Sequence, residues 1–150
     1  MPEKNCLGEI SVKEFEANKH LIKDEVILKR IKHVIYEDER VLESVEALKC
    51  GDIAKFGQLM NQSHDSLQYD YEVTGDELDI MVEEARKIKG VVGSRMTGGG
   101  FGGCTVSIVD DGSVDEFIKT VGANYEKRTG ITPEFYVSEI GDGGHEVTDF

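Results

Sequence analysis

The sequence is poor in several residue types that define common protein classes. It has 150 residues with no tryptophan, 2 prolines and 3 cysteines. The cysteines lie far apart and form no C-x-x-C pair, so neither a disulfide framework nor a zinc knuckle is indicated. Unpaired cysteines suit a reducing compartment, and we expect the protein in the cytoplasm. The start, MPEKNCLGEI, lacks the basic-then-apolar order of a signal peptide, and no run of about 18 apolar residues could cross a membrane.

Basic residues are also scarce. The chain has 17 Lys and Arg against 30 Asp and Glu, which gives a net charge of −13. This charge repels nucleic acid and anionic membrane surfaces at long range, so we expect neither as a partner. An anionic ligand would have to be held by local donors. The length and the 39% hydrophobic content suit a single domain, residues 1–150, with a sizeable core.

Helices are predicted for most of the N-terminal part. The capping box SVKE at 11–14 opens a helix to about Lys23, and apolar residues at three- and four-residue steps predict a long helix over 24–49. Further helices are predicted over 52–67, capped by Asp52, and over 74–90, behind a second capping box, TGDE. We expect the apolar stripe of the long helix to be buried, so that Leu42→Ala would cost about 2–5 kcal/mol. The stripe consists of Ile27, Ile31, Val34, Ile35, Val41, Leu42, Val45 and Leu48.

The C-terminal part changes to short runs rich in β-branched residues. VVGSRMT (91–97) and CTVSIV (104–109) predict two strands. A third capping box, SVDE at 113–116, predicts a helix to about Thr129, and TPEFYVSEI (132–140) predicts a further strand. Helices followed by a β-loop-β-α-β order predict an α+β fold whose antiparallel sheet is covered by helices.

A cluster of glycines separates the first two predicted strands. Glycine loses more conformational freedom on folding than any other residue, so such a cluster weakens a fold unless something uses it. The spacing fits G-x-G-x-x-G, but a strand follows where a dinucleotide fingerprint needs a helix. It also fits the glycines of a Walker A loop, but Cys104 occupies the lysine position. The cluster is Gly98, Gly99, Gly100, Phe101, Gly102 and Gly103, called the glycine loop below.

The residues alone leave two interpretations of the glycine loop open. Consecutive glycine amides can point at one anion with no Cβ in the way, and Arg95 is the only charged residue between Val91 and Val109. Equally, the glycines could form a loose hairpin loop or let a helix pack closely on the sheet.

Two stretches carry a family resemblance. GSRMTGGGFGGCTVSIV (93–109) resembles the third sequence motif of the GHMP small-molecule kinases, in the form typical of galactokinases. SHDSLQYDYEVTGDELDIMVEEA (63–85) is similar to the pattern S-H-x-S-L-R-x-D-Y-E-V-S and the helix that follows it in that family. The long helix before it and the terminal EFYVSEIGDGG are similar as well, so the resemblance covers nearly the whole chain. Gln68 stands where the family usually has arginine, and Thr74 where it usually has serine.

The resemblance implies a fold, an activity and a division of labour. It implies a C-terminal domain with ferredoxin-like α+β layering, which packs on an N-terminal ATP- and sugar-binding domain that this chain lacks. It implies a kinase that uses ATP and Mg²⁺ to phosphorylate galactose at the anomeric hydroxyl, giving galactose 1-phosphate. The N-terminal domain would supply most of the binding contacts to ATP and Mg²⁺ and would contain the catalytic base. This chain is therefore expected to contain no catalytic residue and no metal ligand.

The resemblance places the glycine loop in the cleft between the domains, beside the phosphates and the sugar. Thr97 and Arg95 are secondary candidates for contact with ligand. Two alternatives remain open at this point: a kinase of the same fold for another sugar, and a non-catalytic regulatory protein that senses galactose and ATP. The sequence upstream of this chain would discriminate them.

Other polar residues favour structural roles. His64 and Asp65 lie near the end of a predicted helix, where a structural histidine is expected more than a general base. Asp70, Tyr71 and Glu72 match the family motif, and a turn that fixes the angle between helices explains them at least as well.

The remaining candidates are expected to serve the fold too. Arg95 is expected to pair with a carboxylate such as Glu72 somewhat more than to face an anion, and Cys104 to be a small buried apolar residue. The histidines His20, His33 and His145 lack the spacing of metal ligands.

Overall fold

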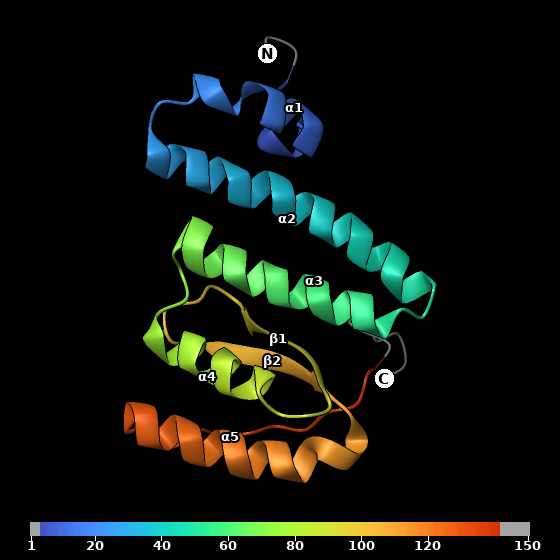
Figure 1. Ribbon diagram of the computed structural model, residues 1–150, viewed down its shortest axis with the longest axis vertical. Coiled ribbons are helices and arrows are strands. Elements are labelled where there is room, and N and C mark those ends of the chain that lie inside the picture. The colour runs from blue at the N-terminus through green and yellow to red at the C-terminus, as the bar shows by residue number, and fades with distance from the viewer. Residues whose placement is uncertain (1–3, 142–150) are drawn as a thin grey trace, which may run out of the picture.

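The computed structural model describes residues 4–141. Layers of helices stack along the long axis of the molecule, with a β-hairpin beside the lower ones (Figure 1). The helices and strands are α1 (Val12–Asn18), α2 (Glu25–Lys49), α3 (Ile53–Ser66), a π-helical turn (Leu67–Tyr71), α4 (Asp76–Arg86), β1 (Val91–Thr97), β2 (Cys104–Val109) and α5 (Val114–Thr129). Short 3-10 turns span Leu7–Glu9, Lys19–Leu21 and Asp111–Ser113.

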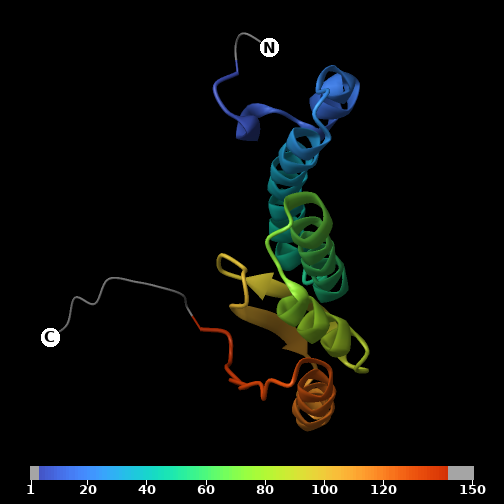
Figure 2. The same cartoon turned by 90° about the vertical axis from the view of Figure 1, so that its left-hand side faces the viewer.

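The α+β fold class is confirmed, with helices first and then a hairpin and a helix. Strands β1 and β2 pair antiparallel, with Ser94 opposite Ser107 and Met96 opposite Thr105. Ser94 and Met96 are buried on the face of the hairpin that packs against α4. In Figure 2 the opposite face has no helix over it among the described residues, and Val106 there is 44% exposed.

Two predicted helix caps are confirmed. The Ser11 hydroxyl accepts the Glu14 amide while the Glu14 carboxylate accepts the Ser11 amide, which is the reciprocal arrangement of a capping box. The Asp52 carboxylate accepts the Lys55 amide at 2.9 Å at the start of α3. The C-terminal end of α5 is closed by Gly130, which has the left-handed conformation with φ 75°.

The other two capping boxes are wrong. The N-cap of α4 is Gly75, which has no side chain to bond the helix amides, and Thr74 one residue earlier is buried with 2% exposure. Ser113 already has helical backbone as the last residue of a 3-10 turn, and its hydroxyl packs against Gly90.

The strand predicted over 132–140 is also wrong, because this segment has no regular secondary structure and pairs with no strand within residues 4–141. Phe135 packs edge-to-face on Phe117 of α5, with ring centroids 6.0 Å apart. Tyr136 and Val137 are 86% and 69% exposed. The sheet of the described residues is therefore two-stranded.

Helix α3 covers the edge of β1 that β2 leaves unpaired. A Cβ on Gly57 would lie 2.1 Å from the Val92 carbonyl oxygen, so the helix backbone lies directly on the strand. The Asn61 side-chain oxygen accepts the Ser94 amide at 2.9 Å, and His64 Nδ1 accepts the Met96 amide at 3.2 Å. Helix side chains thus take the place of a third strand, which satisfies the backbone of this edge.

The apolar core is divided between two small clusters. One lies between α4 and α5 and contains Ala85, Ile88, Phe117 and Val121. The other contains Leu67, Leu78 and Met96, with Val73 packed against it. This second cluster lies directly beneath the start of the glycine loop, because Met96 is the second-last residue of β1.

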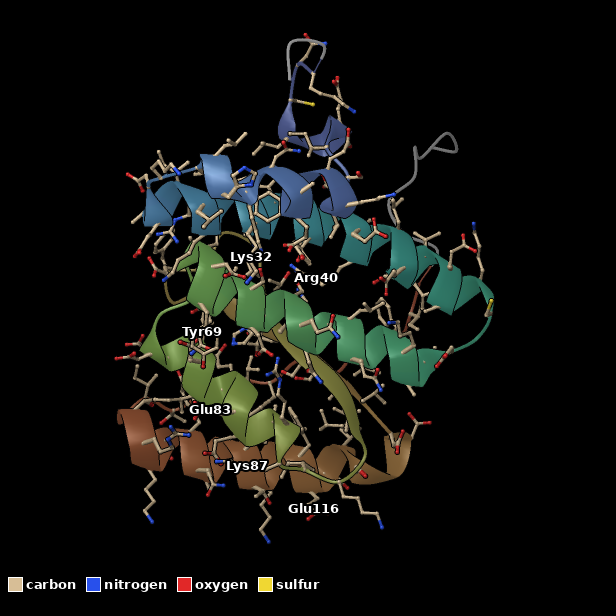
Figure 3. All side chains as sticks on the ribbon, turned by 45° about the horizontal axis from the view of Figure 1, so that its top comes forward. Lys32, Arg40, Tyr69, Glu83, Lys87 and Glu116 are labelled. Atoms are coloured by element: carbon tan, nitrogen blue, oxygen red, sulfur yellow. The ribbon has the colours of Figure 1, made fainter. Side chains whose placement is uncertain are left out.

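The expectation that the stripe of α2 is buried is wrong for most of it. Ile35 is buried, but Leu42 is 65% exposed, and Val41, Val45 and Leu48 are between 42% and 55% exposed. Polar pairs join α2 to the following elements: the Ser63 hydroxyl donates to Glu37, and Lys32 donates to Asp70. Figure 3 shows Lys32 and Arg40 on the side of α2 toward α3. Leu42 belongs to the exposed part of the stripe, so we expect Leu42→Ala to be nearly neutral for this chain.

The closeness of α3 to β1 gives a direct test. Gly→Ala in a helix ordinarily stabilises by up to about 1 kcal/mol. We expect Gly57→Ala to destabilise by roughly 3 kcal/mol instead, because its Cβ would overlap the Val92 carbonyl. Urea unfolding measures this. Gly112→Ala is the control, since a Cβ there meets nothing within 4 Å; equal effects of the two changes would contradict the close contact.

Candidate functional site

The glycine loop joins the ends of β1 and β2 and has an unusual backbone. Gly98, Gly100 and Gly102 have φ of 72°, 81° and 86°, a region that favours glycine. Phe101 also has a positive φ, 54°, which is uncommon for a residue with a side chain. Its ring is 80% exposed, so burial of the ring does not account for this conformation.

The glycines of the loop differ in what requires them. A Cβ on Gly100 would lie 2.0 Å from the Val73 carbonyl oxygen, so packing alone excludes a side chain there. A Cβ on Gly98 or Gly102 would meet nothing within 4 Å, but both residues have a positive φ that favours glycine. Gly99 has neither constraint: its φ is not positive and a Cβ would meet nothing within 4 Å. Packing therefore explains Gly100, and open approach to the backbone is the property that Gly99 adds.

The loop is held at two points. The Phe101 amide donates to the Val73 carbonyl at 3.0 Å, and the Met96 amide donates to His64 Nδ1 at 3.2 Å. One anchor lies in the middle of the loop and the other just before it. Gly98 and Gly99 lie between these anchors, and a Cβ on either would meet nothing within 4 Å.

The charged and polar side chains nearest the loop belong to the strands. Arg95 Nη1 lies 3.7 Å from the Glu37 carboxylate and its Nε donates to the Met96 carbonyl at 3.0 Å. The partner is thus Glu37 and not Glu72. Thr97 ends β1 opposite Cys104, and both are exposed. The expectation of a buried Cys104 is wrong, because Cys104 lies on the face of the hairpin that α4 does not cover.

His64 is a structural residue in this geometry. It is 2% exposed, and its Nε2 lies 3.4 Å from Asp79 Oδ1. Because a backbone N–H donates to Nδ1, the proton of the neutral ring sits on Nε2, facing Asp79. Burial, and next the positive charge of Arg86, lower the pKa of His64. A ring enclosed in this way has no access to a reacting hydroxyl.

Asp65 is likewise engaged by the fold. It accepts from Arg86 at 2.7 Å. Arg86 also donates to the carbonyls of Asn61 at 2.8 Å and Ser94 at 3.2 Å, so one guanidinium connects α3, α4 and β1. This arrangement fixes the position of β1 and therefore of the loop that follows it.

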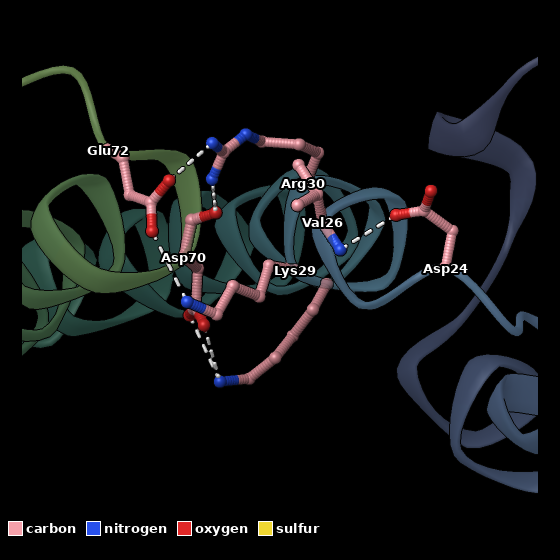
Figure 4. A network of polar contacts seen from close by, with 7 residues as sticks. Asp24, Val26, Lys29, Arg30, Asp70 and Glu72 are labelled. Atoms are coloured by element: carbon pink, nitrogen blue, oxygen red, sulfur yellow. Dashed lines mark hydrogen bonds and ion pairs between the residues drawn. The ribbon is translucent and has the colours of Figure 1, made fainter.

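Asp70, Tyr71 and Glu72 form a turn that α2 holds (Figure 4). The π-helical turn ends at Glu72, which has φ 61°. Lys32 binds Asp70 at 2.9 Å, and Arg30 binds the Glu72 carboxylate at 2.6 Å and also the Asp70 carbonyl. The geometry agrees with a turn that sets the angle between helices.

The histidines are separated from one another. His20 is exposed, His33 bonds the Ser66 hydroxyl at 3.0 Å, and His145 lies outside the described residues. Within residues 4–141 the side chains of His, Cys, Asp and Glu form no group of three or more that could hold a metal ion. Over the same residues, no helix is both long and apolar enough to span a membrane.

Sequence reasoning missed the residues that place the loop. Val73 acts through its backbone carbonyl, which leaves no mark on residue type. Gly57, Asn61 and His64 are spaced by four and then three residues along α3, so they share one face of the helix. A glycine within a predicted helix was the one available signal, since it often marks close packing.

The chain is similar to known kinases. It matches the family model described as "GHMP kinases C terminal" over residues 44–127. It is 59% identical over 141 residues to a galactokinase of Fusobacterium nucleatum, covering 94% of this chain and 36% of that protein. It is 52% identical over 143 residues to a galactokinase of Clostridium acetobutylicum, covering 95% and 37%.

A solved structure is similar as well. The galactokinase of Lactococcus lactis complexed with galactose has a TM-score of 0.90 and 48% sequence identity to this chain. The match covers 94% of this chain and 36% of that structure. The chain therefore spans little more than a third of the length of the relatives that it matches.

The buried His64 predicts a pH dependence of stability. The unfolded chain takes up a proton near the ordinary histidine pKa of about 6.5, and the folded chain does so only at lower pH. The contribution of a neutral His64 is thus complete above about pH 6.5 and is lost as the pH falls toward the folded pKa. His64→Asn keeps an acceptor for Met96 but does not titrate, so its free energy of unfolding should fall less between about pH 7 and 5.

The exposed His20 supplies the control for this measurement. Urea unfolding of His20→Asn should keep the pH dependence of the parent chain. Some dependence should also survive in His64→Asn, because burial lowers the pKa of His33 in the same direction. An unchanged pH profile in His64→Asn would mean that His64 is not held neutral by the fold.

Proposed function

This chain belongs to the GHMP kinase family as a C-terminal domain, and we propose that it forms the C-terminal part of a galactokinase. The reaction transfers the γ-phosphoryl group of ATP to the anomeric hydroxyl of galactose and yields galactose 1-phosphate and ADP. The support is the similarity to several bacterial galactokinases and to a structure with galactose bound.

The observation that carries the proposal is the open backbone of the glycine loop. Phosphoryl transfer depends on positioning and on stabilising charge, with little covalent chemistry for the protein to perform. Backbone amides without Cβ atoms beside them can approach phosphate oxygens closely, and Gly99 meets nothing within 4 Å. No acidic side chain occurs in the loop, so none repels an incoming phosphate. The loop thus fits the phosphate or sugar side of a kinase cleft.

The side chains next to the loop receive different weights in this proposal. Thr97 is exposed at the end of β1, and its hydroxyl is a secondary candidate for contact with ligand. Arg95 already interacts with Glu37 and the Met96 carbonyl, so we assign it to the support of the loop.

The remaining machinery is assigned to a second domain. We place the catalytic base, the Mg²⁺ ligands and most of the ATP site in the N-terminal domain of the kinase, and assign none of them to described residues of this chain. That domain would pack on this one, and the exposed stripe of α2 offers apolar surface for the contact. The cytoplasm is the proposed compartment, since the cysteines are all free and exposed.

The proposal predicts a selective effect of a charge at Gly99. In the intact kinase, Gly99→Asp should lower kcat/KM for ATP by about 100- to 1,000-fold, because like charges near 4 Å repel by about 4 kcal/mol at an effective dielectric of 20. Thermal stability should hardly change, since position 99 is open and free of positive φ. A coupled ADP-release assay with galactose measures the rate.

Gly112→Asp is the matched control for this test. It adds the same charge at another open glycine, in the 3-10 turn before α5. It should leave kcat/KM unchanged. A folded Gly99→Asp kinase with normal turnover would remove the loop from the phosphate site. A parent kinase that phosphorylates a different sugar, or none, would favour the alternative functions.

A further inference from the structure

The two non-glycine residues with positive φ among the described residues meet at one place. They are Glu72, φ 61°, and Phe101, φ 54°. Val73 separates them: it follows Glu72 in the chain, and its carbonyl accepts the Phe101 amide at 3.0 Å. Uncommon backbone conformations persist only where the surrounding structure imposes them, and they cluster at functional sites. This pair marks the support of the glycine loop.

Val73 fixes the loop closely. A Cβ on Gly100 would lie only 2.0 Å from the Val73 carbonyl oxygen, so the loop backbone packs directly on Val73. The Val73 amide donates to the Leu67 carbonyl at 3.2 Å, and its side chain packs on the cluster of Leu67, Leu78 and Met96. A shift of Val73 would therefore move the loop.

The conformation of Glu72, one residue earlier, is held from α2. Arg30 binds the Glu72 carboxylate at 2.6 Å and the Asp70 carbonyl, so a single guanidinium spans the turn (Figure 4). Lys29 adds a contact to Glu72 at 3.2 Å. The ring of Tyr71, the residue between Asp70 and Glu72, stacks on His33 with ring centroids 4.6 Å apart. Charge-assisted bonds of this kind add geometric specificity as well as energy.

The Arg30–Glu72 pair is placed at the surface. The side chains are 31% and 49% exposed, and exposed ion pairs contribute little to stability. Positioning is far more sensitive, because a displacement of about 1 Å can cost about 100-fold in rate. The pair thus suits a role in placing the loop better than a role in holding the fold together.

We infer that Arg30 is a positioning residue of the kinase, which holds the Glu72–Val73 turn and through it the glycine loop. The inference rests on the proposed function, since it takes the loop to face the ligand. It gives the motif residues Asp70 to Glu72 a purpose: they transmit the position of α2 to the loop.

The test uses the intact kinase with Arg30→Met, which keeps an unbranched apolar stem and removes the charge and donors of the guanidinium. The KM for ATP should rise about 10-fold with little change in thermal midpoint. Hydrogen exchange of the Phe101 amide should become faster, because its acceptor is no longer held in place. Lys55→Met is the matched control, since Lys55 pairs with Glu43 of α2 at 2.9 Å with similar exposure but does not touch the turn. It should change neither quantity.

Further variants separate positioning from simple loss of stability. Arg30→Glu should be the most impaired, and adding Glu72→Arg should recover part of kcat/KM, because the reversed pair restores the ion pair but not the bond to the Asp70 carbonyl. If Arg30→Met does not fold, Glu72→Gln replaces it and should raise the KM for ATP in the same way. Unchanged KM and exchange in a folded variant, or equal changes in Lys55→Met, would overturn the inference. The Gly99→Asp test is independent: if it succeeds while these fail, the proposed function stands and the inference falls.

Discussion

The backbone of α3 lies in direct contact with the edge of β1, and this contact holds the hairpin that carries the glycine loop. Gly57 and Gly93 make it possible, since a Cβ on either would lie less than 3 Å from the backbone of the other element. At this separation Asn61 and His64 reach the amides of Ser94 and Met96, and α3 completes a strand edge that would otherwise be unpaired. The hairpin is fixed by this contact, and the glycine loop inherits its position from the hairpin.

Polar contacts connect α3 and β1 to the neighbouring helices. Arg86 ties α4 to α3 and β1, while Arg30 and Lys32 tie α2 to the turn after α3. The loop is therefore set by hydrogen bonds and ion pairs more than by a large apolar core. Most of the apolar stripe of α2 is exposed. We connect this surface with the domain on which the chain packs in the proposed kinase.

The sequence predicted elements well where the signal is local. Strands β1 and β2 have the bounds that their β-branched runs predict, and α5 ends at Thr129 before a left-handed Gly130. It failed where the answer depends on a distant partner. Amphipathic spacing showed that α2 has an apolar face but not what that face meets, and the 132–140 segment has strand composition without a strand beside it. The glycine loop was located by composition, but only the structure separates Gly100, which packing requires, from Gly99, which packing does not.

We propose that the amides of the glycine loop face the nucleotide in the intact kinase. Nuclear magnetic resonance of the glycine-labelled protein, titrated with a non-hydrolysable ATP analogue in the presence of galactose, tests it most directly. We expect the amide resonances of Gly98 and Gly99 to move on saturation while that of Gly112 does not. Loop resonances that stay in place while calorimetry shows the nucleotide bound would contradict it.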